Sequence, residues 1–488
     1  MKLRNQKLWA LGLAATMVAA SFAGCAKDGG DTSTTTTADG ATTAKTDSGK
    51  EDPATTPDPN GPTSGKRSKA NVTAAPSKRN VTIGAWYDFY YTSKDDSVDD
   101  DPNQANEEQG EAMLQSIRDV EERYNCTVEV VNLTYEGTRD SINTSIMAGT
   151  PDCDIYLLDN SFGVPAVLNG YAEALEDYVA EDDDVWGEQK IMTSMKLPGS
   201  DKTYMFAPQS GENVITGLYY LGCNLDLITQ AGLENPQDLW DNNEWTWDKF
   251  EEYCLALTDS TKGTYGIGGR YTNFFIQLVM SNGAAIAEGP QQGIDSPATI
   301  EAMDFFSKLA SVDKVTQFNI DDWNTNETNY TDGKTAFWVT AQWISDSNGD
   351  KDLPFEIAWV PFPIGPSGNK ETNFYGVVGT TFYMIPLGAD DPTYIYNVFE
   401  DWKNWYNGDT SFRDSDMTWW EDCALTERNY QYCWEAGKNR NHLDLWDAIG
   451  VDQNYVTGLI TGEMTAAQAA EQYKQLYDDA CKTYFGGN

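Results

Sequence analysis

The stretch Asp154-Ile155-Tyr156-Leu157-Leu158-Asp159-Asn160 decides how this chain folds. Its apolar run contains no charged residue and stops at Asp159 and Asn160, which is typical of a strand buried on both faces of a parallel sheet. Upstream, the hydrophobic pattern predicts a strand, a helix, a strand and a helix at 81–87, 108–124, 128–130 and 141–148. Strands that alternate with helices in this way predict an α/β lobe with a parallel sheet.

Polar and aromatic residues follow two of these strands. Trp86 and Asp88 come after the first strand, and Asp159 and Asn160 come after the third. Ligands of open parallel sheets bind beyond the carboxyl ends of the strands, so these residues are candidates for ligand binding. Asp and Asn at such places also cap helices or close loops, and that alternative stays open.

The second half of the chain is richer in helices. Good starts for a helix are found at 245–248, at Ser296-Pro297 with a helix to 309, and at the capping box 465–468 before a final helix. Prolines and glycines between 361 and 368 interrupt the helical pattern, and a strand pattern resumes at 375–385. The residues after 79 are too numerous for one small core, which predicts two lobes.

The charge of the chain limits its partners. The net charge of the 488 residues is −43, and the residues after 79 carry −47 because residues 1–79 contribute +4. So negative a protein disfavours nucleic acid, anionic lipid surfaces and polyanionic substrates. Aromatic residues make up 12 % of the chain and include 16 tryptophans. Such rings fill cores, and they also stack on flat ligands.

The first 79 residues predict an export signal and a tether. A basic start and the short apolar stretch 8–20 are typical of a signal peptide over 1–24. Phe22-Ala23-Gly24-Cys25 resembles a lipobox, with Phe22 where Leu is usual, so Cys25 is the expected lipidation site. The alternative is an ordinary signal peptide cut near Ala23. Residues 25–79 are rich in Thr, Ser, Ala, Gly and Pro, which predicts a disordered tether.

The remaining cysteines and acidic residues predict neither a disulfide framework nor a metal site. Seven cysteines remain besides Cys25, and no Cys-x-x-Cys occurs. Cys423 and Cys433 are close enough in sequence to pair, but buried free thiols are the expectation. The run 346–352 has the alternating oxygen ligands of a calcium loop without its glycine and glutamate, so it predicts a solvated acidic turn.

Motifs for catalysis are absent. His442 is the only histidine, which excludes His-x-x-x-His zinc sites and leaves one residue for any Ser-His or Cys-His pair. Gly333-Lys334-Thr335 lacks the upstream glycine of a phosphate-binding loop, and no Gly-x-Ser-x-Gly turn is present. We therefore expect no catalytic residue, no metal and no cofactor. A carboxylate pair for glycoside hydrolysis stays open, because the chain has 76 acidic residues.

A family resemblance covers nearly the whole of 80–488. The motifs that carry it, in order, are 148–159 (Gly-Thr-Pro-Asp before the apolar strand), 217–233 (Leu-Tyr-Tyr to Ala-Gly-Leu), 245–250 (Trp-Thr-Trp-Asp-Lys-Phe), 281–284, 332–337 with Trp343, and 360–366. In this order they resemble the extracellular solute-binding proteins of sugar ABC transporters, the family that includes maltose-binding protein. Leu221-Gly222-Cys223 before Asn224 departs from the family pattern.

The resemblance implies a fold: a two-lobed α/β clamp, like the periplasmic binding proteins, that closes on a ligand about hinge crossovers. The expected lobe 1 comprises 80–210 and 360–415, and lobe 2 comprises 211–359 and 416–488. The crossings are expected near 204–216, 357–361 and 414–426.

The resemblance also implies a sugar ligand, because the family binds sugars by aromatic stacking and by hydrogen bonds to hydroxyls. Trp343 matches the stacking tryptophan of the family, with a core tryptophan as the alternative. Phe274 and Tyr375 join Trp86, Asp88, Asp159 and Asn160 as expected ligand contacts, whereas Trp338 is expected in the core.

The expected function is therefore capture of a carbohydrate, and of an oligosaccharide in particular, for an ABC transporter permease. The protein would act as a monomer at the extracellular face of the cell membrane, held there by its lipid. The alternatives are a surface glycoside hydrolase and a glycan-tethering lipoprotein.

Overall fold

The computed structural model describes residues 72–87, 92, 94, 107–181, 183–186, 202–206, 219–370, 382–413, 415, 418–439 and 444–486. Cys25, Asp88 and Tyr375, which the sequence singles out, lie outside these residues. Among the described helices, none has both the length and the apolar character that crossing a bilayer requires.

The first lobe is built on a four-stranded sheet with the order β2-β1-β3-β8. The strands are β1 Arg79–Ala85, β2 Cys126–Asn132, β3 Ile155–Leu158 and β8 Phe382–Met384. β1 runs parallel to β2 and β3, whereas β8 is antiparallel to β3. All four residues of β3 are buried, as its uninterrupted apolar run predicts. The parallel sheet expected from the sequence is therefore confirmed.

The helices of the first lobe agree in part with those predicted from the sequence. They are α1 Glu107–Tyr124, α2 Tyr135–Ser141, α3 Asn160–Leu168, α12 Pro392–Lys403 and α13 Thr410–Arg413. α1 buries Leu114, Ile117 and Val120 on one face, which confirms the predicted helix. The helix expected at 141–148 begins earlier, because the Thr134 side chain caps α2, and it continues as the π-helix Ile142–Ile146. Short 3₁₀ helices cover Leu175–Asp177 and Asp184–Trp186.

The second lobe contains a four-stranded sheet with the order β5-β6-β4-β7. Its strands are β4 Tyr220–Asn224, β5 Tyr265–Gly268, β6 Thr335–Thr340 and β7 Ile357–Val360. β5 is parallel to β6, and β4 is antiparallel to both of its neighbours. Trp338 of β6 is fully buried and stacks on Tyr330, with ring centroids 4.3 Å apart, so its expected place in the core is confirmed.

The second lobe carries most of the helices. They are α5 Leu225–Gln230, α6 Pro236–Asp241, α7 Trp247–Leu257, α8 Tyr271–Ser281, α9 Pro297–Ser307, α10 Trp323–Thr328, α11 Gln342–Asn348, α14 Thr418–Ala424, α15 Glu427–Asn439, α16 Asn454–Thr461 and α17 Ala466–Phe485. The side chains of Thr246, Ser296 and Thr465 cap α7, α9 and α17, and the capping box at Thr465 is complete. The π-helix Lys308–Val312 follows α9, and the 3₁₀ turn Asp350–Asp352 follows α11.

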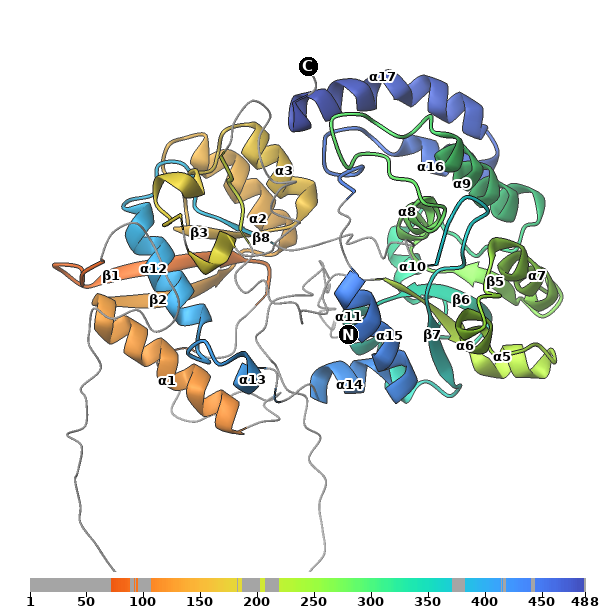
Figure 1. Cartoon of the computed structure of the whole chain (residues 1–488), viewed down its shortest axis with the longest axis horizontal. Helices are drawn as coiled ribbons and strands as arrows, with labels where there is room; N and C mark the ends of the chain where they lie inside the picture. The colour runs from red at the N-terminus through yellow and green to blue at the C-terminus, as the bar shows by residue number, and fades with distance from the viewer. Residues whose placement is uncertain are drawn as a thin grey trace, which may run out of the picture.

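Figure 1 shows the two sheets with their helices as two groups, with segments from distant parts of the sequence in each. α12 and α13 return to the first group, since Gln109 Nε2 of α1 donates to the carbonyl of Phe412 at 2.8 Å. α14 packs on α11 and therefore belongs to the second group. The expected lobe boundaries at the first and third crossings stay predictions.

The crossing expected at 357–361 is wrong. These residues form β7, which pairs with β4, and the chain continues along the second lobe. Trp247 N donates to Ile364 O at 3.0 Å, and Ser367 N donates to the Asn282 side chain at 2.9 Å. The assignment of 360–370 to lobe 1 is corrected accordingly. The crossing expected from the family resemblance is thus replaced by a segment that stays bonded to the second lobe.

All seven described cysteines are buried and free, which confirms the expectation of buried thiols. They are small apolar side chains of the core rather than crosslinks.

Candidate functional site

The first sheet ends in a cluster of aromatic and polar side chains. Trp86 follows β1 and meets the rings of Tyr135 and Phe162 edge to face, with centroids 5.6 and 5.8 Å away. Asp159 follows β3 and caps α3, where its carboxylate accepts a hydrogen bond from Ser161 N at 2.8 Å. Asp159 therefore caps a helix, as the alternative interpretation expected, and it also lies at the end of a strand.

Polar groups of this cluster are buried and keep unused hydrogen-bonding capacity. Trp86 is 6 % exposed and Asn160 is 5 % exposed. Within the part of the chain that the structure describes, Trp86 Nε1 and Asn160 Oδ1 have no hydrogen-bond partner. Burial raises the pKa of Asp159, while hydrogen bonds from Ser161 and Tyr135 lower it. Buried polar groups are normally paired, so unpaired ones at a strand end indicate a place for a ligand or water.

The second sheet ends in a comparable cluster. Tyr219 precedes β4, Arg270 follows β5, and Trp343 lies in the first turn of α11 directly after β6. Tyr220 pairs with Thr340, so the start of β4 and the end of β6 meet at one edge of the sheet. Considering the described residues alone, Tyr219 Oη, Arg270 Nε and Trp343 Nε1 are buried without a partner.

A charge of the first strand-end cluster acts on ionisable groups of the second lobe. Burial, followed by the negative charges of Asp159 and Asp444, raises the pKa of Asp447 to about 7. Burial also raises the pKa of Tyr219, on which the charges of Arg270 and Asp159 act in opposite directions. The charge of Asp159 in the first lobe thus acts on Asp447 and Tyr219 in the second. In Figure 1, α3 and α11 lie on the sides of the two lobes that face each other.

Phe274, predicted as a ligand contact, is a core residue. Its side chain has no exposed surface and packs against Phe250, Phe306, Phe318 and Phe362, with ring centroids 5.8–6.4 Å away. It therefore has no surface with which to meet a ligand in this structure. Trp86, Asp159, Asn160 and Trp343 lie at the two strand ends, and Asp88 and Tyr375 lie outside the described residues.

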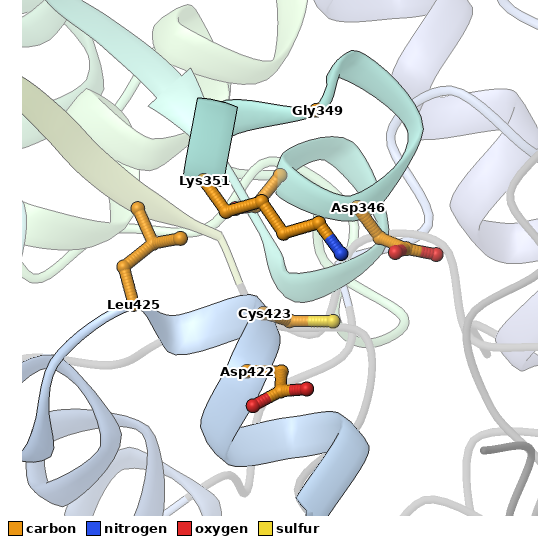
Figure 2. A pocket seen from close by; sticks show the side chains of 7 residues that line it. Asp346, Gly349, Lys351, Asp422, Cys423 and Leu425 are labelled. Atoms are coloured by element: carbon orange, nitrogen blue, oxygen red, sulfur yellow. The ribbon is translucent and has the colours of Figure 1, made fainter. Parts of the chain in front are cut away.

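A pocket lies elsewhere, between α11, the turn Asp350–Asp352 and α14. Its lining is Ser345, Asp346, Gly349, Lys351, Asp422, Cys423 and Leu425. Figure 2 shows the Lys351 ammonium and the Cys423 thiol pointing into one space, with the carboxylates of Asp346 and Asp422 to the sides. The pocket lies where α11 meets α14 and is not part of the strand-end clusters. Among the described residues, no group of histidines, cysteines and carboxylates could hold a metal ion.

The acidic run 346–352 is the solvated turn that the sequence predicts only in part: Asp346 and Asp352 are exposed, whereas Asp350 is buried. It ends α11 and forms a 3₁₀ turn in which Asp350 is only 3 % exposed. The Asp350 carboxylate accepts a hydrogen bond from Tyr330 Oη at 2.7 Å, which ties the turn to the core. The expectation fails for Asp350 because Tyr330, which is distant from this turn along the chain, supplies a buried partner.

Sequence reasoning missed Tyr219, Arg270 and Asp447. Arg270 follows β5, so the rule of strand ends could have found it, whereas Tyr219 precedes β4 and reaches the end of β6 only through antiparallel pairing. Asp447 has no local signal. Only the charge of Asp159, which acts on its carboxyl group in the folded protein, relates it to the strand ends.

Comparisons with known proteins agree with this architecture. A family model described as bacterial extracellular solute-binding protein matches residues 104–393. No curated protein matches the chain.

Solved structures resemble the chain over most of its length. The cyclic alpha-maltosyl-1,6-maltose binding protein of Arthrobacter globiformis is 15 % identical with a TM-score of 0.58, and 83 % of this chain and 99 % of that one are covered. The GacH receptor of Streptomyces glaucescens, solved unliganded and with acarbose, is 16 % identical with a TM-score of 0.54 and the same coverage. UgpB of Mycobacterium tuberculosis, solved with glycerophosphocholine, is 15 % identical with a TM-score of 0.53, covering 76 % and 94 %. At these identities the likeness concerns the fold.

Proposed function

The chain belongs to the bacterial extracellular solute-binding protein family, and on this premise we propose that it captures a carbohydrate between its lobes for an ABC transporter. An oligosaccharide is the form we propose, and the permease of the transporter is the proposed receiver. The protein binds its ligand and carries out no reaction on it.

One observation carries the proposal: aromatic rings and unpaired polar groups occupy both facing strand ends. Trp86 and Trp343 offer indole N–H donors, Tyr219 offers a hydroxyl, and Asn160 offers an amide oxygen. A sugar has hydroxyls that donate and accept hydrogen bonds, and C–H faces that pack on rings. A buried polar group without a partner costs about 1–3 kcal/mol, so a hydroxyl-rich ligand regains that free energy on binding.

The charges near the site favour a ligand without a negative charge. Asp159 and Asp447 contribute carboxylates, and the charge of Arg270 is neutralised by its ion pair with Glu327. An anionic sugar would meet repulsion that a neutral sugar avoids. The GacH receptor, which shares the fold, was solved in complex with acarbose.

Capture follows from the two-lobed arrangement. A ligand that contacts both strand ends binds the closed arrangement more tightly than the open one, and it shifts the population toward closure by that difference in affinity. The closed form is then the one that the permease receives. Cys25 would hold the protein at the extracellular face of the membrane, with 25–79 as its tether and the protein as a monomer.

Calorimetry against neutral mono- and oligosaccharides, a uronate oligosaccharide and free amino acids tests the proposal. We expect saturable binding of a neutral saccharide without product formation. Trp343→Ala should weaken binding about 10- to 100-fold, since a central aromatic contact is worth roughly 2 kcal/mol, and Trp343→Phe should retain part of it.

Other results would replace the proposal. Hydrolysis of the saccharide that disappears when two carboxylates are replaced supports a glycoside hydrolase. Binding to insoluble glycans alone, with no response to short saccharides, supports the glycan-tethering alternative.

A further inference from the structure

Arg270 lies directly on Trp343. The guanidinium carbon is 4.6 Å from the centre of the Trp343 ring, within the range of a cation–π contact. Arg270 follows β5 and precedes α8, whereas Trp343 belongs to α11 after β6. Both side chains are well buried, Arg270 at 7 % and Trp343 at 6 % exposure. One face of the indole is thus covered by an arginine from a neighbouring strand end.

The guanidinium is held in place from the other side. Its Nη2 forms an ion pair with the carboxylate of Glu327, which lies in α10. The α10 helix is tied to α11, because Asn348 Nδ2 donates to Glu327 O at 2.9 Å. Arg270 therefore connects three elements: the strand end that carries it, the helix that carries Glu327 and the helix that carries Trp343.

The backbone beside Arg270 is also fixed. Gly269 has a φ of +84°, and a Cβ there would lie 3.2 Å from Val339 N and from Trp338 Cβ. Gly269 N donates to Asn329 Oδ1 at 3.0 Å, just beyond the end of α10. Only glycine combines this φ with so close an approach to β6. The turn thus leads the chain against β6 and sets where the arginine side chain begins.

The ion pair leaves little charge to attract a ligand. Glu327 neutralises the guanidinium, and within the described structure Arg270 Nε and Trp343 Nε1 remain without hydrogen-bond partners. A planar guanidinium can stack on an indole and keep a carboxylate at its fork, which an ammonium cannot do. The arrangement suits holding a ring in one orientation better than recognising an anion.

We infer that Arg270 is a positioning residue: held by Glu327, it covers one face of Trp343 and fixes the orientation of the indole at the strand end where we propose that the sugar binds. The inference rests on the proposed function for its ligand. Its structural part, the control of Trp343 by Arg270, can be tested without any ligand.

The test uses Arg270→Met, Arg270→Lys and Glu327→Gln, each with and without Trp343→Phe. The first readout is the near-ultraviolet circular dichroism that Trp343 itself contributes, taken as the difference between each pair. The second is the affinity for maltotetraose by calorimetry. Arg79→Met is the matched control, because Arg79 lies 5.0 Å over the Tyr394 ring and pairs with Asp154 in the first lobe.

We expect Arg270→Met and Glu327→Gln to reduce the Trp343 signal by more than half and to weaken maltotetraose binding about tenfold, the equivalent of one partly buried cation–π contact. Arg270→Lys should restore part of both, and Arg79→Met should change neither. If Arg270→Met does not fold, Glu327→Gln and Arg270→Lys carry the same comparison.

Two outcomes would overturn the inference. An unchanged Trp343 signal in all three variants would mean that Arg270 does not orient the ring. Tighter maltotetraose binding by Arg270→Met would mean that Arg270 occupies the face that the sugar needs. If maltotetraose does not bind the wild type, the proposed function fails for this ligand, and the dichroism still decides the role of Arg270.

Discussion

Asp350 is an acidic residue that is buried in the folded protein. It is 3 % exposed, accepts a hydrogen bond from Tyr330 and lies in the turn after α11. Burial raises the pKa of Asp350 to about 7, while hydrogen bonds from Tyr330 and Ser345 lower it. The native protein therefore binds a proton here at a pH where the unfolded chain has released it.

This predicts a specific pH dependence of stability. Between the unfolded pKa of 3.8 and the folded pKa of about 7, the native state binds more protons, so stability from this group falls as the pH rises. Above pH 7 the ionised carboxylate costs the native state at most about 4 kcal/mol. Asp350→Asn keeps the acceptor for Tyr330 and removes the titration.

The measurement is the urea midpoint of wild type and Asp350→Asn at pH 5 and pH 8. The wild type should lose more stability than the variant between these values. Equal losses in both proteins would show that Asp350 does not titrate in this range. Solvent-exposed Asp352→Asn, in the same turn, is the matched control.

At the scale of elements, strand β4 requires a glycine where it pairs with β6. Gly222 lies opposite Trp338 in the pairing of β4 with β6. A Cβ at position 222 would lie 2.6 Å from Trp338 Cε2, and the indole cannot retreat because it is stacked on Tyr330. The glycine is required by this close approach.

Gly222→Ala should therefore destabilise the second lobe by about 1–3 kcal/mol, the usual cost of overpacking. Chemical denaturation followed by tryptophan fluorescence measures it. Gly289→Ala serves as the control, since a Cβ there would meet nothing within 4 Å. Equal stability of the two variants would contradict the packing argument, and Gly222→Ala combined with Trp338→Leu should recover part of the loss.

At the scale of the whole molecule, the proposed anchor separates the clamp from the membrane. If Cys25 carries the lipid, Cys25→Ser should release the exported protein from the membrane fraction into the medium. Sugar affinity should stay within about twofold of the wild type, because binding energy resides in the contacts at the strand ends. Fractionation of cells that express each form, with calorimetry of the purified proteins, gives the answer.

If wild-type protein is also recovered in the medium, residues 1–24 act as an ordinary signal peptide that is cut near Ala23. Cys423→Ser is the control for a cysteine change, because that cysteine is buried in the second lobe. Its distribution between membrane and medium should match that of the wild type.

Local signals were enough to predict several elements and the place of two candidate residues at strand ends. The apolar run before Asp159 predicts β3, the cap at Thr465 predicts α17, and the rule of strand ends predicts Trp86 and Asp159. Each depends on neighbours a few residues away, and a single sequence contains that information.

Packing between distant segments decided the rest. The family resemblance implies a crossing at 357–361, yet pairing with β4 keeps that segment in the second lobe. Phe274 is a core residue because four rings from other elements surround it. Arg270 meets Trp343, and Asp447 comes under the charge of Asp159, only once the sheets are formed. Periodicity shows which face of an element is apolar, but the free energy of burial and pairing decides which elements meet there.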